Sequence, residues 1–333
     1  MLVSRRHFFC TTLAGLAASR SFSASPPARE LRFGICADVH KDIMHDADSR
    51  LRTFIADMSA RDLDFIVELG DFCTPKAKNR GFLDIFNGYP GPKYHVLGNH
   101  EIDGGHTWRE AMDYLGLAAP YYSFDAGGYH FVVLDGNNKP TGHTAGYPKY
   151  IGAEQLSWLE KDLGKTTQPT VVFCHQALHN SAHGMLDNHE EVRQVLARAG
   201  GKVVACLTGH RHVDGHHEEK GIHYLAINSM SYHWVGGKYA HARFSEEIEA
   251  AHPHLKSTIP YDTPLYTVVT LRPNGELLLE GRAGDFIAPT PDQLGVPRSH
   301  SGDAPITASI TDRHISISGQ QGGGRSNPRR DGS

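Results

Sequence analysis

Short apolar runs alternate with helical patterns along this chain, and that alternation restricts the fold more than any other feature. The five clearest runs are rich in Val, Ile, Leu and Phe and are short enough to be strands buried on both faces. They are LRFGICA (31–37), DFIVELG (64–70), KYHVLG (93–98), TVVFCH (170–175) and KVVACLTGH (202–210). Between them, apolar residues recur at helical spacing, as at Leu51, Phe54, Ile55 and Met58. We therefore expect an α/β fold in which helices cover the sheets.

Glycine-containing turns in the later part of the chain predict antiparallel strand pairs, so the sheets should be mixed. Residues 121–135 are expected to form two strands joined at Gly127 and Gly128, and further pairs are expected around Gly221 and around residues 273–275. The stretch 232–263 is rich in His, Lys and Glu and interrupts this rhythm. It is expected to be either a long loop or a small cap over a site.

The two ends of the chain differ in composition from the part between them. Arg5 and Arg6 precede a short apolar stretch and then small residues, and residues 1–25 resemble a bacterial twin-arginine (Tat) signal peptide. This resemblance implies recognition by the Tat export machinery and a periplasmic or secreted mature protein. Residues 289–333 are rich in Pro, Ser, Gly and Arg, and we expect a disordered tail there. One domain is expected over residues 31–284.

The net charge and the apolar content of the sequence argue against two classes of binding partner, nucleic acids and membranes. The formal net charge of −4 gives no basic footprint for nucleic acid or for an anionic membrane surface, and no segment after the signal is apolar enough to cross a membrane. Cys36, Cys174 and Cys206 lie inside apolar runs and are expected to be buried thiols, so no disulfide framework is indicated. Cys73 could belong either to the core or to the surroundings of a site. Histidine is abundant, with 23 residues, which invites a search for metal ligands.

Five of the expected strands end in side chains that can bind a metal ion. These side chains are Asp38 and His40, Asp71, Asn99 with His100 and Glu101, His175, and His210 with His212. Open α/β sheets bind ligands beyond the carboxyl ends of their strands, so the groups should converge. A single such residue would be unremarkable, but a set in register at five strand ends predicts a metal centre.

The residue types indicate which metals would bind. Residues two apart after a strand should point the same way, which would bring together Asp38 with His40 and His210 with His212. Carboxylate and imidazole ligands without thiolates suit Mn, Fe or Zn. Seven ligands are too many for one tetrahedral ion and suit two ions that share a carboxylate. Two ions about 3.5–4 Å apart would clamp an in-line displacement at phosphorus and would deprotonate a water between them.

The ordered set DVH, GD, GNHE, H and GHRH resembles the motif blocks of the calcineurin-like metallophosphoesterases, and the resemblance covers about residues 31–281. It implies a four-layer αββα sandwich, in which two mixed sheets pack face to face between helices. It also implies ligand roles for seven side chains. Asp38, His40 and His212 would bind the first ion, Asp71 would bridge, and Asn99, His175 and His210 would bind the second.

The same resemblance gives His100 a role other than binding metal. It would lie beside the substrate and either protonate the leaving alkoxide or stabilise the phosphoryl charge, and Glu101 would orient it. Purple acid phosphatases have a tyrosine three residues after the bridging aspartate. Thr74 occupies that position here, so a tyrosinate-coloured ferric centre is not expected.

Two further stretches resemble one branch of the family, the manganese-dependent ADP-ribose and CDP-alcohol diphosphatases. They are YYSFDAGGYHFVVLDGN (121–137) and EQLSWLEKDL (154–163). Members of that branch often have glutamine at the position of His40, so their substrates are not carried over from the resemblance alone.

Several residues outside these blocks have weaker expectations. A surface loop is favoured for His179, His183 and His189, and solvent exposure for His216 and His217. Arg211 should point away from the metals. Two alternatives stay open for Tyr232, His233 and Trp234, which could hold an organic leaving group or pack as ordinary aromatic residues.

The resulting hypothesis is an exported enzyme with two metal ions that hydrolyses phosphodiester or diphosphate bonds of a small phosphorylated substrate. A phosphomonoesterase would use the same ligands. A non-catalytic metal- or phosphate-binding protein should have lost His100 or the bridging ligand, and both are present. A histidine-rich metal buffer should have its histidines in tracts away from strand ends.

Overall fold

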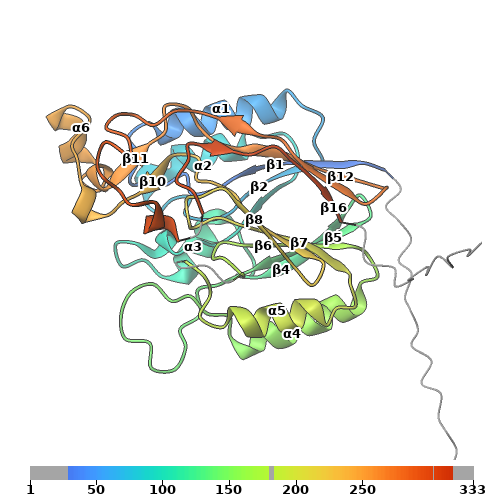
Figure 1. Ribbon diagram of the computed structural model, residues 1–333. Helices are drawn as coiled ribbons and strands as arrows, with labels where there is room; N and C mark the ends of the chain where they lie inside the picture. The colour runs from blue at the N-terminus through green and yellow to red at the C-terminus, as the bar shows by residue number, and fades with distance from the viewer. Residues whose placement is uncertain (1–28, 180–183, 303, 318–333) are drawn as a thin grey trace, which may run out of the picture.

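Two six-stranded sheets pack face to face in the computed structural model, with helices on both outer sides (Figure 1). The structure describes residues 29–179, 184–302 and 304–317, so the expected signal peptide lies outside the described residues. Both sheets contain parallel and antiparallel neighbours. The expected four-layer αββα sandwich with mixed sheets is confirmed.

The first sheet, called sheet A, has the strand order β16-β13-β12-β1-β2-β3. Its strands are β1 (Leu31–Cys36), β2 (Phe65–Glu68), β3 (Lys93–His95), β12 (Thr267–Arg272), β13 (Glu276–Leu279) and β16 (Arg313–Ser316). Strands β1, β2 and β3 are parallel neighbours connected through helices, and their carboxyl ends therefore lie at one edge of the sheet.

The second sheet, called sheet B, has the order β4-β5-β6-β7-β9-β8. Its strands are β4 (Tyr122–Ala126), β5 (Tyr129–Leu134), β6 (Thr170–Cys174), β7 (Val203–Thr208), β8 (Gly215–Glu219) and β9 (Ile222–Ala226). The expected hairpins at Gly127–Gly128 and at Gly221 are the antiparallel pairs β4–β5 and β8–β9. The neighbours β6 and β7 are parallel, so the residues that follow them also meet at one edge.

Three apolar clusters hold these layers together. The inner faces of the two sheets interdigitate through aromatic rings, as where Phe33 contacts Phe65 in its own sheet and Phe131 and Phe173 in the other. Helices α1 (Ala47–Ser59) and α2 (Arg80–Asn87) cover the outer face of sheet A, and α4 (Ala153–Lys165) and α5 (His189–Ala197) cover that of sheet B. Helix α3 (Trp108–Leu115) follows β3 and packs at the edge of the α1–α2 cluster.

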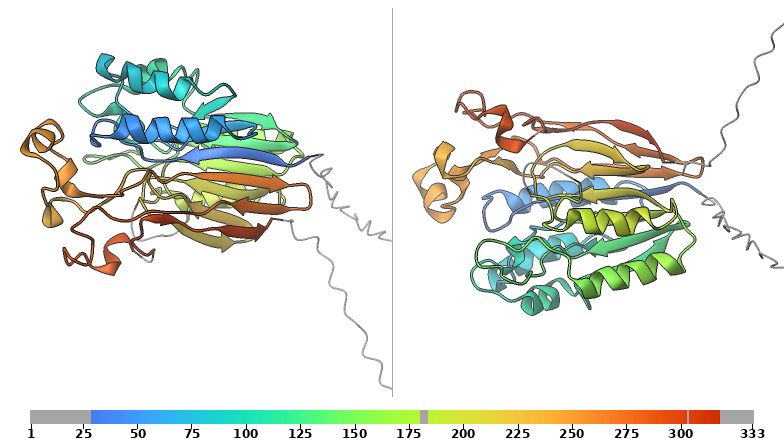
Figure 2. Two further views of the ribbon diagram at one scale, coloured as in Figure 1. Left: turned by 90° about the horizontal axis from the view of Figure 1, so that it is seen from above. Right: turned by 60° about the horizontal axis from the view of Figure 1, so that its bottom comes forward.

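The stretch 232–263 is a folded excursion that begins and ends in a two-stranded ribbon. Strand β10 (Tyr232–Trp234) pairs with β11 (Thr258–Pro260), and the short helix α6 (Glu246–Ala251) lies between them. Figure 2 shows this excursion, in orange, at the same end of the sheets as the red 3-10 turn Arg298–Ser301.

The expectation of a disordered tail from residue 289 is wrong for the described residues up to 317. Strand β15 (Ser309–Ile310) pairs with β14 (Arg282–Ala283), and β16 adds an edge strand to sheet A. Ile315 and Ile317 join the inter-sheet core, so the domain extends past residue 284. Apolar residues at alternate positions of a short strand drive this docking, although the surrounding composition is polar. Residues 318–333 lie outside the described residues.

No helix within the described ranges is long and apolar enough to cross a membrane.

Candidate metal centre

Five of the seven expected ligands have a left-handed backbone. Within the described ranges six residues other than glycine have positive φ, and five of them are Asp38, His40, Asp71, His210 and His212, with φ between 50° and 66°. Each such residue costs on the order of 1–3 kcal/mol, and such strain gathers at functional sites. These ligands therefore converge because the chain turns sharply after each strand, and the simple alternation assumed from the sequence is not the reason.

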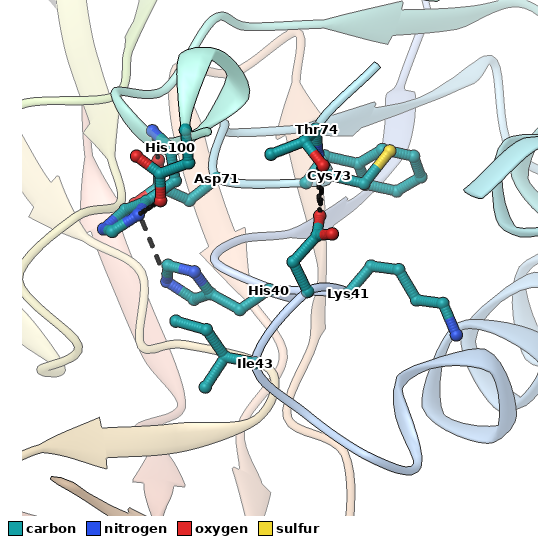
Figure 3. A pocket seen from close by; sticks show the side chains of 10 residues that line it. His40, Lys41, Ile43, Asp71, Cys73, Thr74 and His100 are labelled. Atoms are coloured by element: carbon teal, nitrogen blue, oxygen red, sulfur yellow. Dashed lines mark hydrogen bonds and ion pairs between the residues drawn. The ribbon is translucent and has the colours of Figure 1, made fainter. Parts of the chain in front are cut away.

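Asp71 lies at the middle of the cluster. Its Oδ2 is 3.1 Å from His175 Nε2 and 3.6 Å from His40 Nε2, so a single carboxylate oxygen faces two groups of ligand candidates. Its Oδ1 accepts a hydrogen bond of 2.8 Å from the backbone N–H of His100. Figure 3 shows His40, Asp71 and His100 close together at this point.

One side of the cluster is formed by Asp38, His40 and His212. The Nε2 atoms of the two histidines are 3.1 Å apart, and Asp38 Oδ1 is 3.3 Å from His212 Nε2 and 3.9 Å from His40 Nε2. Asp38 also accepts two bonds of 3.0 Å from the backbone N–H of His210, which ties the end of β1 to the end of β7. The three side chains offer ligand atoms close enough to hold one ion.

The other side is formed by His175 and His210, together with Asp71. His210 Nδ1 lies 3.1 Å from His175 Nε2, and the three side chains again offer converging ligand atoms. Asn99 lines the same cavity and is buried, and its Oδ1 has no hydrogen-bond partner in the protein. A buried, unsatisfied acceptor is costly, and a metal ion would relieve that cost.

Backbone carbonyls fix the orientation of two of the histidines. His175 Nδ1 lies 2.7 Å from the Leu69 carbonyl and His212 Nδ1 lies 2.8 Å from the Tyr232 carbonyl. Because a carbonyl only accepts, Nδ1 carries the hydrogen in each ring, and Nε2 is directed at the cluster. Metal-binding histidines are commonly oriented in this way.

Burial and neighbouring charges shift the pKa values of the candidate ligands in different directions. Burial favours the neutral carboxyl, but the charges of His175 and His100 outweigh it and hold the pKa of Asp71 well below its usual range. Burial likewise lowers the pKa of His175, but the charge of Asp71 raises it to about 10. Burial dominates at His40 and His210 and keeps the pKa of each well below the usual value. Asp71 is thus ionised, His40 and His210 are neutral imidazoles, and His175 would have to release a proton to bind a metal ion. Carboxylate and imidazole donors of this kind fit a metal centre.

His100 has a partner that the sequence did not reveal. Its Nδ1 lies 2.6 Å from Asp103 Oδ2, and Tyr147 donates a 2.6 Å hydrogen bond to Asp103 Oδ1. Burial lowers the pKa of His100, but the charge of Asp71 and the bond to Asp103 raise it to about 9. His100 also lies near enough to His40 and Asp71 to count as a third group of potential ligands.

The expected role of Glu101 differs from its observed contacts. Glu101 is fully buried, and its Oε1 accepts a 2.8 Å hydrogen bond from the backbone N–H of Phe72. It therefore braces the chain after Asp71, and Asp103 occupies the place beside His100. Glu101 ends the GNHE motif and Asp103 follows it by two residues, so spacing alone could not distinguish them.

The remaining expectations have mixed outcomes. Cys73 is buried among the core residues, and burial raises its pKa, so it is an unreactive thiol. His216 and His217 are exposed on β8, as expected, whereas His179 and His189 are buried. His183 lies outside the described residues. Thr74 donates to Asp42 Oδ2 at 2.8 Å and takes no part in the cluster.

Above the cluster lies a cavity of about 490 Å³, which falls in the range of sites for small molecules. Its floor carries the candidate ligands and His100, and its walls carry Tyr147, Arg211, residues 232–234, His300 and Ser301. Arg211 lines this wall, and its Nη2 donates to the Ser301 carbonyl at 2.7 Å.

The sequence model of calcineurin-like phosphoesterases matches residues 31–214, which is more than half of the chain. The chain belongs to the calcineurin-like phosphoesterase family. As a member of this family it is a metal-dependent phosphoester hydrolase. The order of the strands and the motif at each strand end place the cluster where the family resemblance predicted it.

Curated relatives point to one branch of the calcineurin-like phosphoesterases. A manganese-dependent ADP-ribose/CDP-alcohol diphosphatase of Arabidopsis thaliana is 26% identical, over 50% of this chain and 71% of its own length. The protein of the same name from Oryza sativa subsp. japonica is 25% identical, over 50% of this chain and 68% of its own length.

Solved structures share the fold. A dimetal phosphatase from Danio rerio superposes with a TM-score of 0.59 at 15% identity, covering 88% of this chain and all of its own. GAP50, described as the anchor in the inner membrane complex of Plasmodium, superposes with a TM-score of 0.50 at 13% identity, covering 78% of this chain and 86% of its own. At these identities the likeness establishes the architecture alone.

Proposed function

We propose that this protein is an exported phosphoesterase with two metal ions, which hydrolyses phosphodiester or diphosphate bonds of small molecules. The observation that carries the proposal is the set of five left-handed ligand candidates gathered around Asp71. Strain of this kind is retained where the geometry serves a function.

The chain would hold its ions in two neighbouring positions. Asp38, His40 and His212 would bind one ion, and Asn99, His175 and His210 would bind the other. Asp71 would contact both, because its Oδ2 already faces His40 on one side and His175 on the other.

Bound ions of this type supply positive charge for the phosphoryl oxygens and lower the pKa of a water nucleophile. His100 supplies the proton for the leaving oxygen. Asp103 holds Nδ1 of the ring, which leaves Nε2 to carry the transferable proton, and the raised pKa of His100 keeps that proton in place at neutral pH.

Diester or diphosphate cleavage is favoured over monoester cleavage by the cavity walls. A phosphomonoester needs room for one organic group, whereas the lining of this cavity of about 490 Å³ includes two exposed aromatic side chains, Tyr147 and Trp234. The names of the two curated relatives, both diphosphatases, support the same preference. Export is proposed from Arg5 and Arg6 and the apolar stretch behind them.

A substrate panel with measured metal content tests this proposal. Purified protein is reconstituted with Mn, Fe or Zn, and its rates are compared on bis-p-nitrophenyl phosphate, p-nitrophenyl phosphate, ADP-ribose and CDP-glycerol. We expect two ions per chain and a higher kcat/KM for the diester or a diphosphate than for the monoester. A preference for p-nitrophenyl phosphate would reverse the assignment to phosphomonoesterase.

Asp71→Asn tests the shared ligand. We expect it to bind one ion or fewer and to lose most of its activity, because the amide cannot supply the negative charge that both positions share. Two ions per chain with activity retained would refute the bridging role of Asp71.

A further inference from the structure

Two exposed aromatic side chains stand on the walls of the same cavity. Among the described residues, Tyr147 and Trp234 are the exposed large hydrophobic side chains, at 41% and 42% exposure. Both line the cavity above the metal centre, although they are far apart in the sequence. Exposed apolar surface that gathers at one cavity marks a site of binding.

Trp234 ends a row of aromatic rings that starts at the candidate ligands. The ring of buried Tyr232 lies 4.8 Å from that of His212 and 5.1 Å from that of His40, and 6.4 Å from that of Trp234. Trp234 is thus one side chain away from the metal centre, a position suited to the organic part of a bound phosphoester.

The chain holds Trp234 in place from two sides. Its strand β10 pairs with β11, with Trp234 opposite Thr258. Its carbonyl lies 3.2 Å from His300 Nε2, which belongs to the 3-10 turn Arg298–Ser301. These contacts fix the backbone of Trp234, so its position on the cavity wall is set before a ligand binds.

The same turn organises the rest of the wall. The Ser301 carbonyl accepts from Arg211 Nη2 at 2.7 Å, and Ser301 Oγ lies 3.1 Å from His233 Nε2. His233 Nδ1 lies 2.9 Å from the carbonyl of His212, a candidate ligand. The wall around Trp234 is therefore built by residues 211, 232–234 and 300–301, and the last two segments lie outside the region matched by the family model.

Tyr147, the second exposed aromatic side chain of the cavity, is held by the residues around His100. Tyr147 donates to Asp103 at 2.6 Å, and its ring lies 4.9 Å from that of His100. The cavity lining thus includes one exposed aromatic ring beside His100 and another beside Tyr232.

We propose that Trp234, on the wall held by His300, is the binding site for a flat aromatic group such as a nucleobase on the substrate. This inference rests on the proposed function and specifies the substrate class: phosphodiesters or diphosphates that carry an aromatic base. Aromatic stacking of a base contributes about 1–3 kcal/mol, or roughly 5- to 150-fold in affinity.

Two esters with the same leaving group test the site. Thymidine 5′-(p-nitrophenyl phosphate) and methyl p-nitrophenyl phosphate both release p-nitrophenol and differ in the group that remains on phosphorus. We expect Trp234→Ala to lower the ratio of their kcat/KM values about 10-fold, mainly through a higher KM for the thymidine ester. Trp234→Phe keeps a flat ring and should restore most of the ratio.

A binding measurement separates this inference from the proposed function. Titration calorimetry of the manganese-loaded protein with thymidine 5′-monophosphate and with methyl phosphate should show tighter binding of the nucleotide, and Trp234→Ala should abolish the difference. If wild-type protein binds the nucleotide through Trp234 but hydrolyses neither ester, the proposed function fails and the aromatic site stands. If Trp234→Ala leaves both the ester ratio and the nucleotide affinity unchanged in protein with a wild-type melting temperature, the aromatic site is refuted.

Discussion

Replacing Gly98 by alanine should damage the metal centre although Gly98 binds nothing itself. A Cβ at this position would lie 2.1 Å from the backbone N of Asp71 and 2.3 Å from Asp71 Oδ1. Gly98 is not among the glycines with positive φ, so the obstacle is space and not backbone conformation. The end of β3 passes the end of β2 at a distance that only glycine allows.

The size of the effect follows from which atoms must move. Asp71 N cannot rotate away as a side chain does, so the segment must shift by about 1 Å to restore ordinary contact. Overpacking of a buried site typically costs about 1–3 kcal/mol, and we expect the upper part of that range here. A shift of this size also displaces the carboxylate that faces both ligand groups.

Gly164→Ala provides the matched control. Gly164 lies in α4, is exposed, and has nothing within 4 Å of an added Cβ. Alanine should stabilise this helix by up to about 1 kcal/mol. Urea unfolding gives the two free energies, and elemental analysis gives the metal bound per chain. Gly98→Ala with wild-type stability and wild-type metal content would show that the contact between the two strand ends does not position Asp71.

Three further predictions concern chemistry, pH and export. His100→Ala should keep its metal ions and melting temperature but lose about 10²–10⁴-fold in rate, and the loss should be smaller for p-nitrophenyl esters than for alkyl esters, which need protonation. Asp135 is buried, which raises its pKa to about 6 despite hydrogen bonds from Asn137. The folded state therefore holds this proton more tightly than the unfolded state, so this group's contribution to stability is lost as the pH rises from about 4 to 6. Asp135→Asn should remove that dependence, worth about 3 kcal/mol, in urea unfolding at pH 4, 5.5 and 7. Replacing Arg5 and Arg6 by lysine should retain the precursor in the cytoplasm of a bacterial host, as measured by cell fractionation.

Each of these predictions has an outcome that would contradict it. Loss of metal from His100→Ala would make His100 a ligand, and equal losses for all leaving groups would make it a stabiliser of phosphoryl charge. Parallel pH profiles for wild type and Asp135→Asn would show that Asp135 stays ionised across this window. Periplasmic accumulation of the double lysine variant would mean that another route exports the chain.

The position of the metal centre could be predicted because chain direction decides it. Parallel neighbours place their carboxyl ends together, so Asp38 and Asp71 had to lie close once their strands were recognised as neighbours, and so did His175 and His210. The left-handed backbone of Asp38, Asp71 and His210 could not be predicted, because neither Asp nor His requires it. In the structure this backbone conformation accompanies hydrogen bonds from the N–H groups of Asp38 and His40 to the carbonyls of Gly70 and Asp71.

The contacts of His100 could not be predicted from the sequence, for a different reason. Tyr147 lies in the loop between β5 and α4, which has no periodicity, and its position depends on tertiary contacts.

Helix α2 was missed because it is only two turns long, although Phe82, Leu83 and Phe86 are buried. Strand β16 was missed because four residues in a polar, glycine-rich stretch give no pattern long enough to recognise.

The position of β1 between β2 and β12 has a consequence for the order in which the protein folds. Leu31, in β1, is among the first residues of the domain to leave the ribosome. Its partner Leu271 lies in β12, one of the two strands beside β1, and is synthesised much later. At bacterial or eukaryotic synthesis rates the interval between the two is roughly 10–50 s, during which the edge of β1 is unpaired and apolar. The strand that precedes Asp38 is thus synthesised first but acquires its second neighbouring strand late. Metal loading must therefore follow synthesis of nearly the whole chain.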